Sequence, residues 1–139
     1  MATEYYRYII WPEFDGLASY VWLSKPGEDG SGVGYCVGSA TGWYGHIPIS
    51  DQLQADFAAW AIEFEKEVDS FSEDYDSLDW NHFHEQGIEL AIRLKSELGS
   101  ESRVIYVKSH EESNDSLEKY REILDDGSLR NYSSMHECL

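Results

Sequence analysis

Two histidines, His82 and His84, are the residues with the most evident potential for chemistry, because they follow a run of carboxylates. Imidazoles and carboxylates bind zinc, and a bound metal ion could activate water for hydrolysis. Two ligands on one helical face need a spacing of four residues, whereas residues two apart project about 200° from each other. The segment has the pattern of a helix start. A metal-assisted hydrolase that uses this carboxylate run together with His82 or His84 is therefore kept only as the alternative function.

The carboxylate run Glu73–Asp79, here called the acidic loop, could hold a hard cation such as calcium. A calcium-binding EF-hand loop needs glycine at its sixth position, and counting from Asp74 that position is Asp79. The run is interpreted as a solvated loop between helices, and weak, nonspecific binding of a divalent cation stays open.

No other pattern indicates catalysis. The glycine-rich stretch 25–32 lacks the phosphate-binding motifs, and Cys36, with His46 as its nearest partner, has the environment of a buried structural thiol. We therefore expect no enzymatic activity, no cofactor and no dedicated metal site.

The chain after Pro48 predicts an amphipathic helix that is capped by Ser50. Its apolar residues fall on a stripe about 100° wide at 3.6 residues per turn, formed by Leu53, Phe57, Trp60, Ala61, Phe64 and Val68. Glu63 and Glu67 flank the stripe. Ile62 faces away from it, toward either another part of the chain or a partner.

A second amphipathic helix is predicted from about residue 79 or 81 to residue 98, with Gly99 ending it. Its stripe consists of Trp80, Phe83, Gly87, Leu90, Ala91, Leu94 and Leu98. Glycine weakens a helix by about 1 kcal/mol relative to alanine. We therefore interpret Gly87 as a gap that admits a bulky neighbour, Phe57 or Trp60.

Runs of aromatic and β-branched residues predict strands at Tyr5–Trp11 (closed by Pro12), Tyr20–Ser24, Val33–Val37 and Arg103–Lys108. The segment Asp115–Leu124 predicts a short helix, and the chain from about residue 127 is expected to be loosely held. This order predicts one domain over residues 1–139. Its fold class is α+β, with a small antiparallel or mixed sheet packed against two main amphipathic helices.

Twenty-seven acidic residues against ten basic ones give a formal net charge of -17. Such a charge repels nucleic-acid backbones and anionic membranes but attracts basic proteins. The first residues lack the apolar run of a signal peptide, and two cysteines are too few for a disulfide scaffold. We expect a cytoplasmic protein that binds a basic protein, with no direct nucleic-acid or membrane contact.

The acidic residues gather in two clusters, at Glu63–Asp79 and Glu111–Asp126, with aromatic side chains among them. An acidic field accelerates encounter with a basic protein, and desolvated aromatic anchors hold it. The predicted partner-binding residues are Glu63, Glu67, Asp69, Glu73, Asp74, Tyr75, Asp76, Glu111, Glu112 and Asp115. Trp43, Tyr44 and Ile62 could be interface anchors or could be covered by the chain itself.

The stretch from His46 to Leu53, continued by Phe57–Trp60, resembles bacterial immunity proteins of contact-dependent growth inhibition and polymorphic toxin systems. The segment Phe83–Gly99, followed by Val104–Val107, strengthens the resemblance. It implies a small cytosolic protein that neutralises a cognate toxin by direct binding. The implied partner is the toxin's C-terminal domain, a basic protein and often a nuclease whose substrate groove an acidic inhibitor can occupy. An acidic adaptor that sequesters some other basic protein stays a further alternative.

Overall fold

A computed structural model of the protein describes residues 6–13, 19–24, 35–39, 42–44, 48–68, 80–100, 102–107 and 120–132. The elements in chain order are β1 (Tyr6–Glu13), β2 (Ser19–Ser24), β3 (Tyr35–Ser39), β4 (Gly42–Trp43), α1 (Asp51–Val68), α2 (Trp80–Leu98), β5 (Ser102–Val107), β6 (Tyr120–Ile123) and β7 (Leu129–Tyr132).

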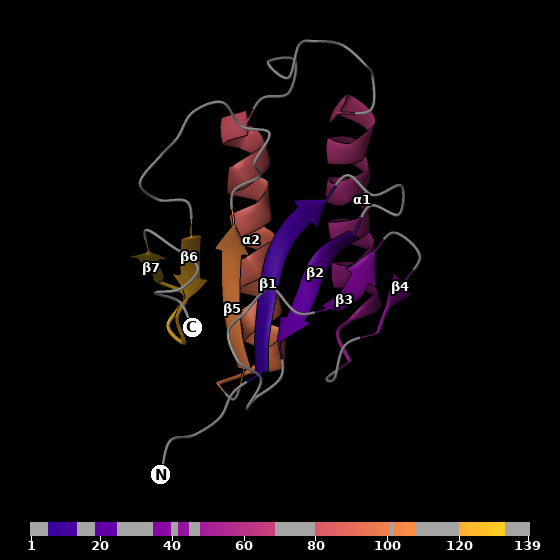
Figure 1. Ribbon diagram of the computed structural model, residues 1–139. Coiled ribbons are helices and arrows are strands. Elements are labelled where there is room, and N and C mark those ends of the chain that lie inside the picture. Colours follow the sequence, from indigo (N-terminus) through magenta and orange to yellow (C-terminus); the bar gives the residue numbers. More distant parts are fainter. Residues whose placement is uncertain are drawn as a thin grey trace.

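The described strands form one seven-stranded sheet in the order β4-β3-β2-β1-β5-β6-β7. The central pair, β1 and β5, is parallel, and every other neighbouring pair is antiparallel. The chain builds outward from β1 to β4 and passes through α1 and α2, which lie side by side on one face of the sheet (Figure 1). It then returns to the centre as β5. The predicted α+β class with two main helices is confirmed, and the mixed sheet is larger than expected.

Alternation along the central strands separates the two faces of the sheet. In β1, Tyr8 and Ile10 belong to the main core beneath the helices, whereas Ile9 faces the other way. In β5, Tyr106 likewise faces the helices. The second face carries a smaller cluster of Ile9, Ile105 and Val107, against which Trp11, Trp22, Tyr120 and Tyr132 pack.

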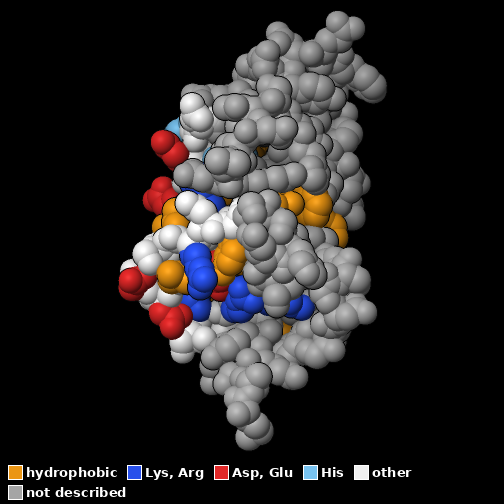
Figure 2. Space-filling view, turned by 60° about the vertical axis from the view of Figure 1, so that its left-hand side comes forward, with side chains coloured by type: hydrophobic (Ala, Val, Ile, Leu, Met, Phe, Trp, Pro, Cys, Tyr) orange, Lys and Arg blue, Asp and Glu red, His pale blue; other side chains and the backbone are white. Residues whose placement is uncertain are grey.

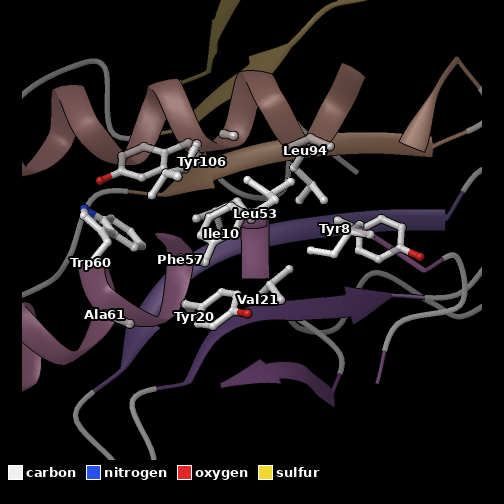
Figure 3. Close-up of a cluster of buried hydrophobic side chains, with 14 of the residues drawn as sticks. Tyr8, Ile10, Tyr20, Val21, Leu53, Phe57, Trp60, Ala61, Leu94 and Tyr106 are labelled. Carbon is white, nitrogen blue, oxygen red and sulfur yellow. The ribbon is translucent and has the colours of Figure 1, made fainter. Parts of the chain in front are cut away.

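The main core is filled largely by aromatic rings from the helices and the sheet (Figure 3). Trp60 of α1 stacks on Phe83 of α2 with ring centroids 4.6 Å apart, and Phe57 stacks on Tyr20 of β2 at 4.8 Å. The predicted stripes are confirmed at the positions whose burial is described, which are Leu53, Phe57, Trp60, Ala61, Phe64, Phe83, Gly87, Leu90, Ala91, Leu94 and Leu98.

Gly87 lets two large rings reach the backbone of α2. A Cβ atom at this position would lie 2.6 Å from Cζ2 of Trp60 and 2.5 Å from Cε2 of Tyr106. The interpretation of Gly87 as a gap for a bulky neighbour is therefore correct. Of the two neighbours considered, the structure places Trp60 there, together with Tyr106 from β5.

Both helix ends that the sequence marks are observed. The Ser50 hydroxyl accepts a hydrogen bond from the Leu53 amide at 3.2 Å, as an N-cap does. The Ser50 amide and hydroxyl also donate to the Glu97 carboxylate of α2, at 2.6 and 2.7 Å. Gly99 follows α2 with a φ of 86°, the left-handed conformation that favours glycine.

The short helix predicted over residues 115–124 is wrong where it can be compared. Residues 120–123 form strand β6, and residues 115–119 lie outside the described part. Tyr120 and Ile123 are three apart, a spacing that a helix would place on one face. In β6 they face opposite sides of the sheet and join the two clusters separately. Pairing with β5 therefore overrides the local pattern.

Two further strand assignments differ from expectation. Residues 129–132 form β7, where the sequence suggested a loosely held segment. Strand β1 continues past Pro12, which was expected to close it, because the register with β2 shifts between Ile10 and Glu13. Proline, which has no N–H to donate, is tolerated at such an irregularity.

Candidate functional site

Most of the predicted partner-binding residues lie outside the part of the chain that the structure describes. Glu63 is an exposed residue of α1, and Glu67 belongs to the last turn of that helix, with its side chain not described. The other eight fall in the segments around the acidic loop and after β5: Asp69, Glu73, Asp74, Tyr75, Asp76, Glu111, Glu112 and Asp115. The structure therefore locates one of the ten predicted side chains.

Glu63 lines a groove between the two helices, here called the helix groove. It has a volume of about 320 Å³ and is lined by Asp56, Ala59, Trp60 and Glu63 of α1 and by Gln86, Glu89, Leu90 and Arg93 of α2. Ala59 leaves space where a longer side chain would fill the gap. Polar and apolar atoms line it about equally. Trp60 and Leu90, only 4% and 7% exposed, contribute part of the apolar surface.

One wall of the helix groove is held by an ion pair between the helices. Nη1 of Arg93 lies 2.8 Å from Oδ2 of Asp56, and the Gln52 amide donates to the other oxygen of this carboxylate at 2.9 Å. The hydrogen bond from Arg93, and then that from Gln52, lowers the pKa of Asp56. Asp56 and Arg93 therefore neutralise each other and link the two helices beside the groove.

The other two acidic side chains of the helix groove are not neutralised in this way. Glu63 and Glu89 are exposed, and neither makes a hydrogen bond or an ion pair within the described part of the chain. Once the Asp56–Arg93 pair is set aside, the helix groove carries two negative charges, one on each helix.

The apolar surface of the helix groove is rigid. The indole N–H of Trp60 donates to the carbonyl of Phe83 at 3.0 Å, and the Trp60 ring packs between Phe83 and the edge of Phe57. This packing depends on the missing side chain at Gly87. The sequence indicated the contact of Trp60 with Gly87 but gave no sign of the polar walls beside it.

The two histidines do not form a pair of metal ligands. Nδ1 of His84 lies 2.6 Å from the Tyr106 hydroxyl, and His84 is only 5% exposed, whereas His82 is exposed. Their different surroundings follow from their spacing of two residues on α2. Among the described residues, no group of three or more histidine, cysteine or acidic side chains is placed to hold a metal ion.

Acidic residues near the end of the second predicted cluster are engaged within the fold. Glu122 accepts two hydrogen bonds from Arg103, at 2.8 and 2.9 Å, and one from Tyr132 at 2.8 Å. Burial alone would raise the pKa of Glu122, but the bonds from Arg103 and Tyr132 outweigh it and lower the pKa. Asp125 lies 3.0 Å from Nζ of Lys95. Glu122, which is also buried, therefore contributes little to a partner-facing surface, whereas Asp125 remains exposed.

The charge of the described surface is uneven. The side of the molecule that carries β6 and β7 shows several arginine and lysine side chains together (Figure 2). The basic residues described on or beside these strands are Lys95, Arg103, Arg121 and Arg130. The helix groove lies on the helical layer instead, and three of its four charged lining residues are acidic.

Trp43, Tyr44 and Ile62, which could be interface anchors or be covered by the chain, differ in their exposure. Trp43 is half-buried and stacks on Tyr8 at a centroid distance of 5.9 Å, so the chain itself covers it. Tyr44 and Ile62 are 69% and 48% exposed. Ile62 lies one helical turn after Ala59, on the outer surface of α1.

A model of the Serratia CdiI immunity protein-like family matches residues 42–109 of the chain. The matched segment spans β4, α1, α2 and β5 and includes every residue of the helix groove. The comparisons found no match of similar significance among characterised proteins or solved structures. None of the described helices is long and apolar enough to cross a membrane. The match confirms the resemblance to immunity proteins of contact-dependent growth inhibition and supports toxin neutralisation as the general function.

Proposed function

We propose that this chain, with a segment similar to Serratia CdiI immunity proteins, binds the C-terminal domain of a cognate toxin and neutralises it stoichiometrically without catalysing a reaction. The observation that carries the proposal is the family match over residues 42–109. That segment contains both helices and a central strand of the sheet.

The toxin domain that fits this chain best is a basic protein, for which we propose a nuclease. Nucleases bind a polyanion, so their substrate grooves are positively charged. A chain with a net charge of -17 is attracted to such a groove over distances comparable with the Debye length, about 10 Å at 0.1 M salt. Binding there would exclude the nucleic-acid backbone. The protein would act in the cytoplasm, where nucleic acids are located.

The proposed contact surface combines the exposed Glu63 of α1 with the acidic residues that follow α1 and β5. Besides Glu63, its members are Glu67, Asp69, Glu73, Asp74, Tyr75, Asp76, Glu111, Glu112 and Asp115. Acidic side chains at such a surface raise the association rate more than they lower the dissociation rate. Aromatic side chains among them would supply most of the hold.

Co-expression with the C-terminal domain of the toxin encoded beside this chain tests the proposal. We expect growth to be rescued, and the purified proteins to form a 1:1 complex whose association rate falls steeply with added salt. Reversing Glu73, Asp74 and Asp76 to lysine should slow association and leave the unfolding transition unchanged. No complex and no rescue would refute toxin neutralisation. Binding to a basic protein other than the toxin would favour an adaptor.

A further inference from the structure

The helix groove has a chemistry that neither the fold nor the family match explains. It combines apolar surface from Trp60 and Leu90 with two carboxylates, Glu63 and Glu89, that have no partner in the described part of the chain. Two carboxylates near each other repel, and a cation between them lowers this electrostatic cost. If the cation is attached to an aliphatic stem, the stem can also cover the neighbouring apolar surface.

We propose that the helix groove receives an arginine side chain of the bound protein. The methylene stem would cover Trp60 and Leu90, and the guanidinium would lie between Glu63 on α1 and Glu89 on α2. Gln86 adds an amide oxygen that can accept a further N–H bond. That the arginine belongs to the toxin rests on the proposed function. That an arginine binds in the groove rests only on the residues that line it.

The dimensions favour a side chain over a metal ion or a large ligand. About 320 Å³ corresponds to roughly ten water molecules at about 30 Å³ each, and is at the lower end of the roughly 300–1,000 Å³ of small-molecule pockets. The carboxylates do not converge with other ligand types on one point among the described residues, as a metal ion would require. A cation at the end of a long side chain suits two carboxylates that line the groove from different helices.

Arginine also fits better than lysine. Its guanidinium is planar and presents five donors in a fixed fork. A lysine ammonium is a compact, strongly hydrated point charge. The groove presents the carboxylates of Glu63 and Glu89 and the amide oxygen of Gln86 from two different helices, and so many acceptors suit the five donors of a guanidinium.

The Asp56–Arg93 ion pair supports the proposal from one end of the helix groove. Because Asp56 is already neutralised at 2.8 Å by Arg93, an incoming arginine is directed to Glu63 and Glu89. The same ion pair connects the two helices that carry Glu63 and Glu89.

Variants that remove the two free carboxylates test this with the toxin domain. The double variant E63Q/E89Q keeps the shape of both side chains and should bind the toxin domain about 10- to 100-fold more weakly, mainly through faster dissociation. The control is D51N/E85Q. It removes the same charge from exposed positions on the same two helices that do not line the groove, and we expect a change of less than about threefold.

A third variant, A59Q, fills the helix groove without changing the charge. Glutamine is a good helix former and position 59 is exposed, so we expect the fold to be kept and the binding to weaken. If the toxin domain binds, but E63Q/E89Q and A59Q both bind it as D51N/E85Q does, the arginine site is refuted while toxin neutralisation stands.

If no complex with the toxin domain forms, a titration with a small probe tests the arginine site by itself. The probe is N-acetyl-arginine amide, with N-acetyl-citrulline amide as an uncharged analogue of nearly the same shape. We expect the arginine probe to shift the NMR signals of the Trp60 indole and of the Glu63 and Glu89 amides saturably in the millimolar range. The citrulline probe, and the arginine probe on E63Q/E89Q, should leave them unchanged. If wild-type protein shows no shifts, or equal shifts with both probes, the arginine site is refuted.

Discussion

Replacement of Gly87 by alanine should destabilise the protein, although alanine is the better helix former. The new Cβ would lie 2.5 Å from Cε2 and 2.7 Å from the hydroxyl of Tyr106, and 2.6 Å from Cζ2 of Trp60. Both rings are buried, and the Tyr106 hydroxyl is bonded to His84, so neither can move freely. Overpacking of this kind costs about 1–3 kcal/mol, and two rings place the cost near the upper end. Subtracting the gain in helix propensity of about 1 kcal/mol leaves a net loss of about 2 kcal/mol.

Urea unfolding measures this loss. With a slope of about 2 kcal/mol per molar urea, the midpoint of G87A should fall by about 1 M. The reverse substitution at an exposed position of α1, A55G, measures the difference in helix propensity between alanine and glycine. It should lower the free energy of unfolding by about 1 kcal/mol. In a W60F background the cost of G87A should be smaller, because one of the three close atoms is removed. If G87A is as stable as the wild type or more stable, the packing argument is wrong.

Three further substitutions probe polar contacts that connect elements. E122Q should lower the free energy of unfolding by about 1–3 kcal/mol at pH 7, because it weakens the bonds from Arg103. The pKa of Glu122 is lower in the folded state, so the difference in unfolding free energy between the wild type and E122Q should persist above pH ~4.5. It should shrink as the pH falls through the folded-state pKa and be absent in acid. A difference that grows in acid would contradict this reasoning. S50A should cost about 1–2 kcal/mol in thermal unfolding through the lost N-cap and the lost bond to Glu97, and E97Q should cost less, because it spares the cap. K95M should speed hydrogen exchange at the amides of Gly99, Ser100 and Ser102, since the lysine donates to the carbonyls of Gly99 and Ser102. Unchanged exchange at these amides would contradict a stabilising role of Lys95.

The helices could be predicted from the sequence because their signals are local. The cap at Ser50, the glycine at position 99 and the apolar periodicity each act within a few residues, so neighbours in sequence are enough to recognise them. Strands β6 and β7 are different, since four residues each carry too short an alternation to separate a strand from a helix. They are strands because β6 pairs with β5, and β7 in turn pairs with β6.

The helix groove could not be predicted for a related reason. Glu63 was selected because it belongs to an acidic cluster, but Glu89 and Gln86 belong to no such cluster and meet it only through the packing of α1 against α2. Relative rotation of two helices is fixed by their packed side chains, here by Trp60 fitting over Gly87. The sequence pointed to this contact, and that contact determines which polar residues flank the groove.

The division of the acidic residues changes what the net charge implies for binding. Asp56, Glu97, Glu122 and Asp125 each contact a group of their own chain, so their charges hold helices and strands together. Substitution of the buried Glu122 would alter stability first, so a loss of binding there has to be compared with the unfolding midpoint. Glu63, by contrast, is exposed and has no partner in the described part of the chain, so its replacement should weaken binding without changing the unfolding midpoint. A scan that ranks acidic residues by exposure and internal pairing therefore separates the partner-facing charges from those that maintain the fold.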